Sequence, residues 1–87
     1  MSTVLIVDDS PTVREMLSEQ LKRSGFNVAE AVDGEEAIEK ITASQPDLVI
    51  TDIVMPRKNG YELCRWIKNE PSTKHIPVVM CTSKGEE

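Results

Sequence analysis

Three aspartates are the residues of this sequence best suited to chemistry. Asp52 follows an apolar run at residues 48–50, which lies between two prolines and predicts a short strand buried on both faces. Asp8 and Asp9 follow a similar run at residues 4–7. In open α/β sheets ligands bind outside the carboxyl ends of the strands, so acids placed there are positioned for chemistry rather than for packing.

Three carboxylates in one crevice repel each other, and a divalent cation relieves that repulsion. A few oxygen ligands that leave several waters on the metal suit Mg²⁺ better than Ca²⁺. Such a metal can also neutralise a phosphoryl group, with Asp52 as the nucleophile of an aspartyl-phosphate reaction. Thr82 follows a later apolar run and can donate its hydroxyl to a phosphoryl oxygen. Taken one at a time, the acids also fit strand-end caps or solvated loop residues.

The rest of the sequence predicts the elements that position these acids. Ser10 is placed to cap a first helix that Gly25 ends, and Asp33 is placed to cap a second. A turn at residues 59–60 precedes a third helix, which Leu63, Cys64 and Ile67 mark. The apolar positions of the first helix are Val13, Met16, Leu17 and Leu21. Strands are expected at residues 4–7, 27–31, 48–50 and 76–81.

This alternation predicts an α/β fold, a doubly wound parallel sheet with right-handed crossovers and helices on both faces. If the first and third strands are neighbours, as in the order 2-1-3-4-5, their carboxyl ends share one crevice. Asp8, Asp9 and Asp52 would then lie together beside Thr82.

Composition excludes several classes of function. The 87 residues are 39% hydrophobic and 29% charged, which indicates one small globular domain rather than a disordered chain. The net charge is −5 with scattered Lys and Arg, so direct binding of nucleic acid is not expected. Apolar runs are too short for membrane insertion and the N-terminus has no signal sequence, so we expect a cytoplasmic location. Cys64 and Cys81 are expected to be reduced, packed thiols.

Several segments together resemble the receiver domain of bacterial response regulators, of the chemotaxis-regulator type. The residues that carry the resemblance are 7–10, 33–34, 46–56, 59–60 and 76–83, so it extends over the whole chain. Residues 81–87 also resemble single-domain receivers of pilus-motility and phototaxis pathways. The resemblance implies a flavodoxin-like fold and a part in two-component signalling.

The resemblance also implies roles for individual residues. Asp52 is the phosphoacceptor, which takes a phosphoryl group from a sensor histidine kinase or a phosphotransfer protein, and Thr82 contacts that group. Asp9 and Asp52 bind Mg²⁺ directly, Asp8 binds it through water, and the backbone carbonyl of Val54 is a further ligand. The chain would not be an enzyme beyond its own phosphorylation and dephosphorylation at Asp52, and its output would be contact with a downstream protein.

By the same resemblance, residues 1–87 form an incomplete receiver domain. A typical receiver continues through a fourth helix, a fifth strand and a fifth helix, which supply a lysine and a switching aromatic. We therefore expect the strand order 2-1-3-4, with residues 78–81 at an edge of the sheet. An unprotected edge strand is a template for another chain. We therefore expect these residues either to belong to a longer chain or to self-associate through the fourth strand, by edge pairing or by exchange of segments.

Three alternatives stay open at this point. A phosphatase of the haloacid-dehalogenase type also uses a strand-end Asp and Mg²⁺, but it needs a second Asp where this chain has Val54. A flavodoxin-like or dinucleotide-binding module needs a phosphate-binding loop where this chain has Asp8 and Asp9. The third alternative is an inactive receiver fragment or an engineered flavodoxin-like scaffold that oligomerises.

Overall fold

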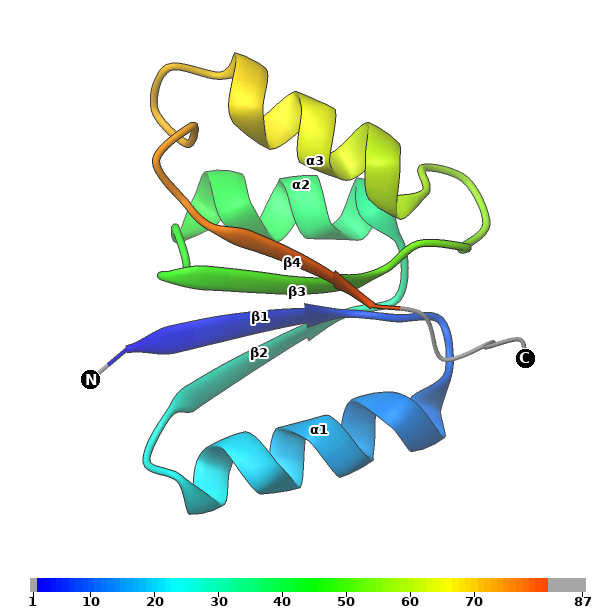
Figure 1. Cartoon of the computed structure of the whole chain (residues 1–87), viewed down its shortest axis with the longest axis vertical. Helices are drawn as coiled ribbons and strands as arrows, with labels where there is room; N and C mark the ends of the chain where they lie inside the picture. Colours follow the sequence, from blue (N-terminus) through cyan, green and yellow to red (C-terminus); the bar gives the residue numbers. More distant parts are fainter. Residues whose placement is uncertain (1, 82–87) are drawn as a thin grey trace.

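The computed structural model describes residues 2–81 of the chain and contains three helices and four strands in that range. In chain order they are β1 (Thr3–Val7), α1 (Pro11–Arg23), β2 (Asn27–Ala31), α2 (Gly34–Ala43), β3 (Leu48–Asp52), α3 (Gly60–Asn69) and β4 (Val78–Cys81). The strands form one parallel sheet in the order β2-β1-β3-β4, which confirms the predicted order. Helix α1 covers one face of the sheet, and α2 and α3 cover the other (Figure 1).

The register of the sheet aligns the carboxyl ends of its strands. At the end of β1, Val7 pairs with Ala31 of β2 and with Thr51 of β3. The next residue of β3, Asp52, pairs with Cys81, the last residue of β4. The first residue after β1 therefore comes to lie beside the last residue of β3.

The main core lies between the sheet and the helices α2 and α3. It includes Leu5 and Val49 from neighbouring strands and Ile41 and Leu63 from the two helices, all with 1% exposure or less. On the other face the expected burial is incomplete: Leu48 and Ile50 are half-buried, because within the described chain α1 is the helix on that face. The prediction that residues 48–50 are buried on both faces is therefore correct in full only for Val49.

Two details of the predicted elements were wrong. Met16, expected on the apolar side of α1, is 53% exposed, whereas Ser18 of the same helix is buried. Strand β4 begins at Val78 rather than at residue 76. Pro77 has no N–H to donate to the ladder, although its carbonyl accepts from the N–H of Val49 at 3.0 Å.

Polar caps fix the starts of the helices. Ser10, Asp33 and Asn59 each accept a hydrogen bond from a backbone N–H three residues later, as side-chain N-caps do. Gly25, with φ of 98°, lies in the turn that follows α1. Between residues 2 and 81, no helix is long and apolar enough to cross a membrane.

Candidate functional site: an acid cluster at the strand ends

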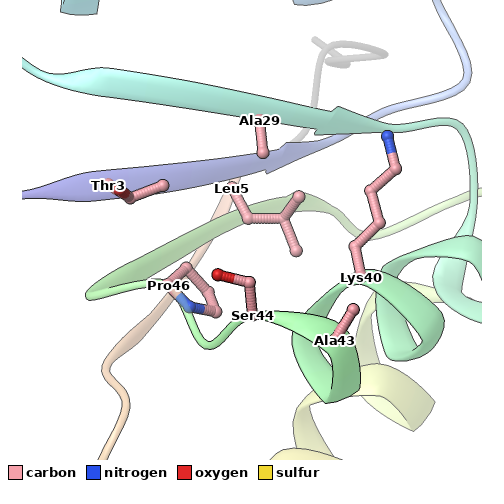
Figure 2. A pocket seen from close by; sticks show the side chains of 7 residues that line it. All are labelled: Thr3, Leu5, Ala29, Lys40, Ala43, Ser44 and Pro46. Carbon is pink, nitrogen blue, oxygen red and sulfur yellow. The ribbon is translucent and has the colours of Figure 1, made fainter.

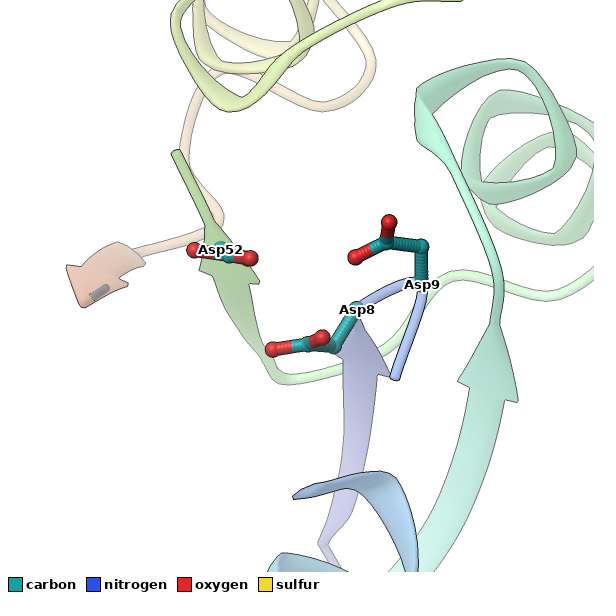
Figure 3. A group of neighbouring side chains, drawn as sticks. All are labelled: Asp8, Asp9 and Asp52. Atoms are coloured by element: carbon teal, nitrogen blue, oxygen red, sulfur yellow. The ribbon is translucent and has the colours of Figure 1, made fainter. Parts of the chain in front are cut away.

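The three predicted acids meet at the carboxyl end of the sheet (Figure 3). Asp8, Asp9 and Asp52 each place a carboxylate oxygen within 4.8 Å of the other two. Asp8 and Asp52 are only 4% and 2% exposed, whereas Asp9 lies at the surface. Two buried carboxylates and one accessible carboxylate therefore lie together, and we call these three residues the acid cluster.

The turn after β1 is tied to β2 by an arginine. The carboxylate of Asp8 accepts a hydrogen bond from the N–H of Ser10 at 2.9 Å. Behind it, the guanidinium of Arg14 donates to the carbonyl oxygen of Asp8 at 2.7 Å and to the carboxylate of Glu30 at 3.1 Å. The Arg14 side chain is only 17% exposed, so this tie is largely shielded from solvent.

The end of β3 is packed directly against the start of α3. One oxygen of the Asp52 carboxylate accepts from the N–H of Ile53 at 2.8 Å, and the carbonyl of Ile53 accepts from the N–H of Gly60 at 2.9 Å. A Cβ atom on Gly60 would lie 2.3 Å from the carbonyl oxygen of Asp52. Only glycine fits there without a shift of the backbone that carries Asp52.

The loop between β3 and α3 contains a second arginine tie. The Nε of Arg57 donates to the carboxylate of Asp33 at 2.8 Å, and the N–H of Gly34 donates to the carbonyl of Lys58 at 3.0 Å. Asp33 is 1% exposed, and its pKa is held below its ordinary value by the N–H of Glu36 first, with the Arg57 guanidinium adding to the effect against the opposing effect of burial. The expected cap of α2 is thus also an anchor for the loop.

The structure brings together Asp8, Asp9 and Asp52 of the residues expected at the site. Val54 follows in the loop, with 58% of the residue exposed, and Thr82 lies outside the described residues. Cys81 pairs with Asp52 but is exposed, so the expectation of a packed thiol was wrong for this residue. Partial burial raises the pKa of the Cys81 thiol, and the charges of Asp52 and Asp8 raise it further.

Arg14 and Arg57 were not identified from the sequence. Arg14 reaches a partner 16 residues away and Arg57 a partner 24 residues away, so neither belongs to a local motif. The only available signal was topological, since both partners belong to β2 or the turn after it, beside the predicted crevice.

The donor set of the acid cluster fits a hard divalent cation. All three groups are carboxylates on neighbouring strand ends, and hard oxygen donors in small number are what Mg²⁺ takes from proteins. The close approach of three negative charges, two of them buried, also gives a cation a favourable electrostatic environment. The arrangement can therefore hold a metal ion next to a carboxylate nucleophile.

A second hollow lies toward the amino end of the sheet, between α2 and the strands β1 and β2 (Figure 2). Its volume is about 250 Å³. The ammonium of Lys40, on its rim, donates to the carbonyl of Glu30. The lining residues are Thr3, Leu5, Ala29, Lys40, Ala43, Ser44 and Pro46. This mainly apolar lining lacks the convergent acids of the other end, so we assign no chemistry to it.

Two proteins of Pseudomonas aeruginosa illustrate the similarity in sequence. Protein PilG of Pseudomonas aeruginosa is 42% identical over 81 residues, which cover 93% of this chain and 60% of PilG. The phosphate regulon transcriptional regulatory protein PhoB of the same species is 40% identical, over 98% of this chain and 37% of PhoB. The chain thus spans less than two thirds of the length of these curated relatives.

Solved structures of receiver domains share the fold. The chemotaxis response regulator CheY4 of Vibrio cholerae matches 99% of this chain and 72% of its own, with a TM-score of 0.91 and 35% identity. The signal receiver domain of a histidine kinase from Syntrophus aciditrophicus gives a TM-score of 0.92 at 38% identity, over 99% of this chain and 65% of its own. The sequence model of one protein family, the response regulator receiver domain, matches residues 4–87. The chain belongs to the response regulator receiver domain family.

Proposed function

We propose that Asp52 is the phosphoacceptor of this receiver domain and that Mg²⁺ bound by the acid cluster assists the transfer. The observation that carries the proposal is the convergence of Asp8, Asp9 and Asp52 within 4.8 Å at the carboxyl ends of β1 and β3. In this assignment Asp9 and Asp52 are direct ligands, Asp8 acts through water, and the carbonyl of Val54 completes the protein's share. Thr82 would contact the phosphoryl group.

The proposed reaction is a transfer between two nucleophiles. An oxygen of the Asp52 carboxylate forms a bond to phosphorus while the bond from phosphorus to the donor's imidazole nitrogen breaks, and the imidazole leaves with that electron pair. Bound Mg²⁺ supplies neutralisation of the charge on the phosphoryl oxygens. Asp52 is buried, and the N–H of Ile53 donates to one of its carboxylate oxygens. Together these two features favour one orientation of the carboxylate.

The donor in this proposal is a sensor histidine kinase or a phosphotransfer protein, and the output is contact with a downstream protein. The chain acts on itself rather than on a separate substrate, with phosphorylation and dephosphorylation both at Asp52. The proposal keeps the cytoplasmic location expected from the sequence. It includes no direct contact with nucleic acid, in keeping with the net charge of −5.

Exposure to acetyl phosphate, a small phosphoryl donor, tests the proposal without the cognate kinase. Intact-mass spectrometry should show a gain of one phosphoryl group in the presence of Mg²⁺ and no gain when the metal is chelated. Peptide mapping should place the label on Asp52. An unlabelled chain under saturating Mg²⁺ would contradict the proposal and favour the inactive-receiver alternative.

Self-association through β4 is the second part of the proposal. β4 is an edge strand of the described sheet, and Val79 on it is 48% exposed. The unpaired backbone groups of such an edge can add a strand from another copy. Light scattering over a range of concentrations should detect association of the 87-residue chain, whereas a folded monomer at every concentration would contradict it.

A further inference from the structure

The loop between β3 and α3 is held at both of its ends and in its middle. Near Asp52, the carbonyl of Ile53 accepts from the N–H of Gly60 at 2.9 Å. In the middle, Met55 is buried, with 7% exposure. At the far end, Arg57 and Lys58 contact Asp33 and Gly34 at the start of α2. Val54 lies between the first two of these attachments, so its backbone position depends on them.

The anchor for Arg57 is rigid. The Asp33 carboxylate is buried, and its other oxygen is already fixed by the N–H of Glu36 at 2.9 Å. A second acid, Glu35, lies 3.8 Å from Arg57, but both of these side chains are about 60% exposed. The tie to Asp33 therefore positions the loop, and the approach of Glu35 adds little.

The backbone of Arg57 is unusual in a way that agrees with this tie. Its φ of 62° lies in the left-handed region, and Arg57 is the one non-glycine residue there among residues 2–81. A residue with a long side chain keeps such a backbone conformation where surrounding contacts hold it. The hydrogen bond from Arg57 to Asp33 and the neighbouring one from the N–H of Gly34 to the carbonyl of Lys58 are those contacts.

We propose that Arg57 is a positioning residue for metal binding, which holds the β3–α3 loop against Asp33 so that the carbonyl of Val54 stays in place beside the acid cluster. The inference rests on the proposed function, since it assigns a supporting residue to the same site. Arg57 is 61% exposed in its side chain, so its loss should weaken Mg²⁺ binding rather than abolish it.

Two single variants remove the tie while they keep the local structure. Arg57→Asn removes the guanidinium and leaves a residue that tolerates the left-handed region. Asp33→Asn removes the charge but retains an oxygen that caps α2. Each should raise the dissociation constant for Mg²⁺, measured by titration calorimetry on the metal-free chain, by roughly two- to fivefold.

The double variant and a control make the test specific. The double variant should bind Mg²⁺ no more weakly than either single variant, because each substitution already breaks the contact between Arg57 and Asp33. Glu35→Gln removes a charge from the first turn of α2 and should leave the dissociation constant unchanged. At saturating Mg²⁺ the maximal rate of labelling by acetyl phosphate should be that of the wild type, so that only the metal concentration for half-maximal rate moves.

Amide hydrogen exchange gives a readout that needs no metal. Release of the loop should speed exchange at Gly34, whose N–H is bonded to Lys58, more than at Gly60. Unchanged Mg²⁺ affinity in both single variants, with normal binding by the wild type, would overturn this inference and leave the proposed function standing. A wild-type chain that binds no Mg²⁺ would overturn both.

Discussion

The two ends of the sheet are built from the same strands but differ in what they present. At the carboxyl end, polar side chains converge: three carboxylates lie within 4.8 Å, and arginines tie the surrounding turns. Toward the amino end, a hollow of about 250 Å³ is lined mainly by apolar side chains and small residues. The hollow offers space without convergent charged groups, whereas the acid cluster offers the donors that a metal ion needs.

The difference follows from how a parallel sheet is connected. In a β-α-β unit the chain leaves the sheet at the carboxyl end of a strand, and a turn then leads into the helix. Such turns carry caps such as Ser10, Asp33 and Asn59, whose polar groups are already oriented toward backbone N–H groups. Chains enter the strands at the other end, where Pro46 and Ala43 contribute little beyond packing.

Replacement of the central acid should have the largest effect. Asp52→Asn keeps the shape of the side chain but removes the nucleophilic carboxylate, so labelling by acetyl phosphate should be abolished while the fold is retained. Asp47→Asn is the matched control, because Asp47 precedes the same strand at its opposite end. Its labelling should equal that of the wild type in intact-mass spectra. Label that survives in Asp52→Asn would place the acceptor elsewhere.

A methyl group at the start of α3 should destabilise the chain and its site together. Gly60→Ala forces a Cβ to within 2.3 Å of the carbonyl of Asp52, and overpacking of this kind costs about 1–3 kcal/mol. The melting temperature should fall by roughly 4–8 °C per kcal/mol, and labelling should slow. At Gly25 an added Cβ would meet no atom within 4 Å, but the φ of 98° favours glycine over alanine. Gly25→Ala should therefore lower stability without changing the labelling rate of the folded chain. Equal labelling in the two variants would break the proposed link between Gly60 and Asp52.

Removal of the accessible acid should separate stability from metal binding. Asp9→Ala relieves repulsion within the cluster, so the free energy of unfolding of the metal-free chain should stay level or rise by about 0.5 kcal/mol. Its melting temperature should then equal that of the wild type or lie a few degrees higher. The increase in melting temperature that Mg²⁺ produces should largely disappear. Glu19→Ala, on the exposed side of α1, serves as the control. An undiminished Mg²⁺ shift in Asp9→Ala would show that the carboxylate site is misassigned.

Filling the hollow should have the smallest effect and none on function. Ala29→Val adds two methyl groups on β2 where space is available, and a β-branched residue suits a strand. Stability measured by urea unfolding should stay level or rise by about 0.5 kcal/mol. Mg²⁺ affinity and labelling should match the wild type, and a change in either would mean that the two ends of the sheet are coupled.

The acid cluster could be predicted from local patterns together with the strand order that the family resemblance implies. Runs at residues 4–7 and 48–50 give the strands, and the acids that follow them must meet if β1 and β3 are neighbours. The ties of Arg14 and Arg57 could not be predicted, since each depends on a side chain reaching across the fold to a distant partner. Met16 was misplaced because helical spacing marks a stripe of residues but not how much of it the sheet covers.

From the central position of β1 we expect a particular order of events when the chain folds. Pairing of β1 with β3 joins residues that are far apart in the sequence, as Thr3 and Asp47 are, with a separation of 44 positions. The residues that pair between β1 and β2 are separated by about half as many positions. Closing the longer loop costs more entropy, and the intervening α1, β2 and α2 lie within it. We therefore expect the acid cluster to form with one of the latest contacts. A cation that binds there acts on the finished structure, so it should slow unfolding far more than it speeds folding.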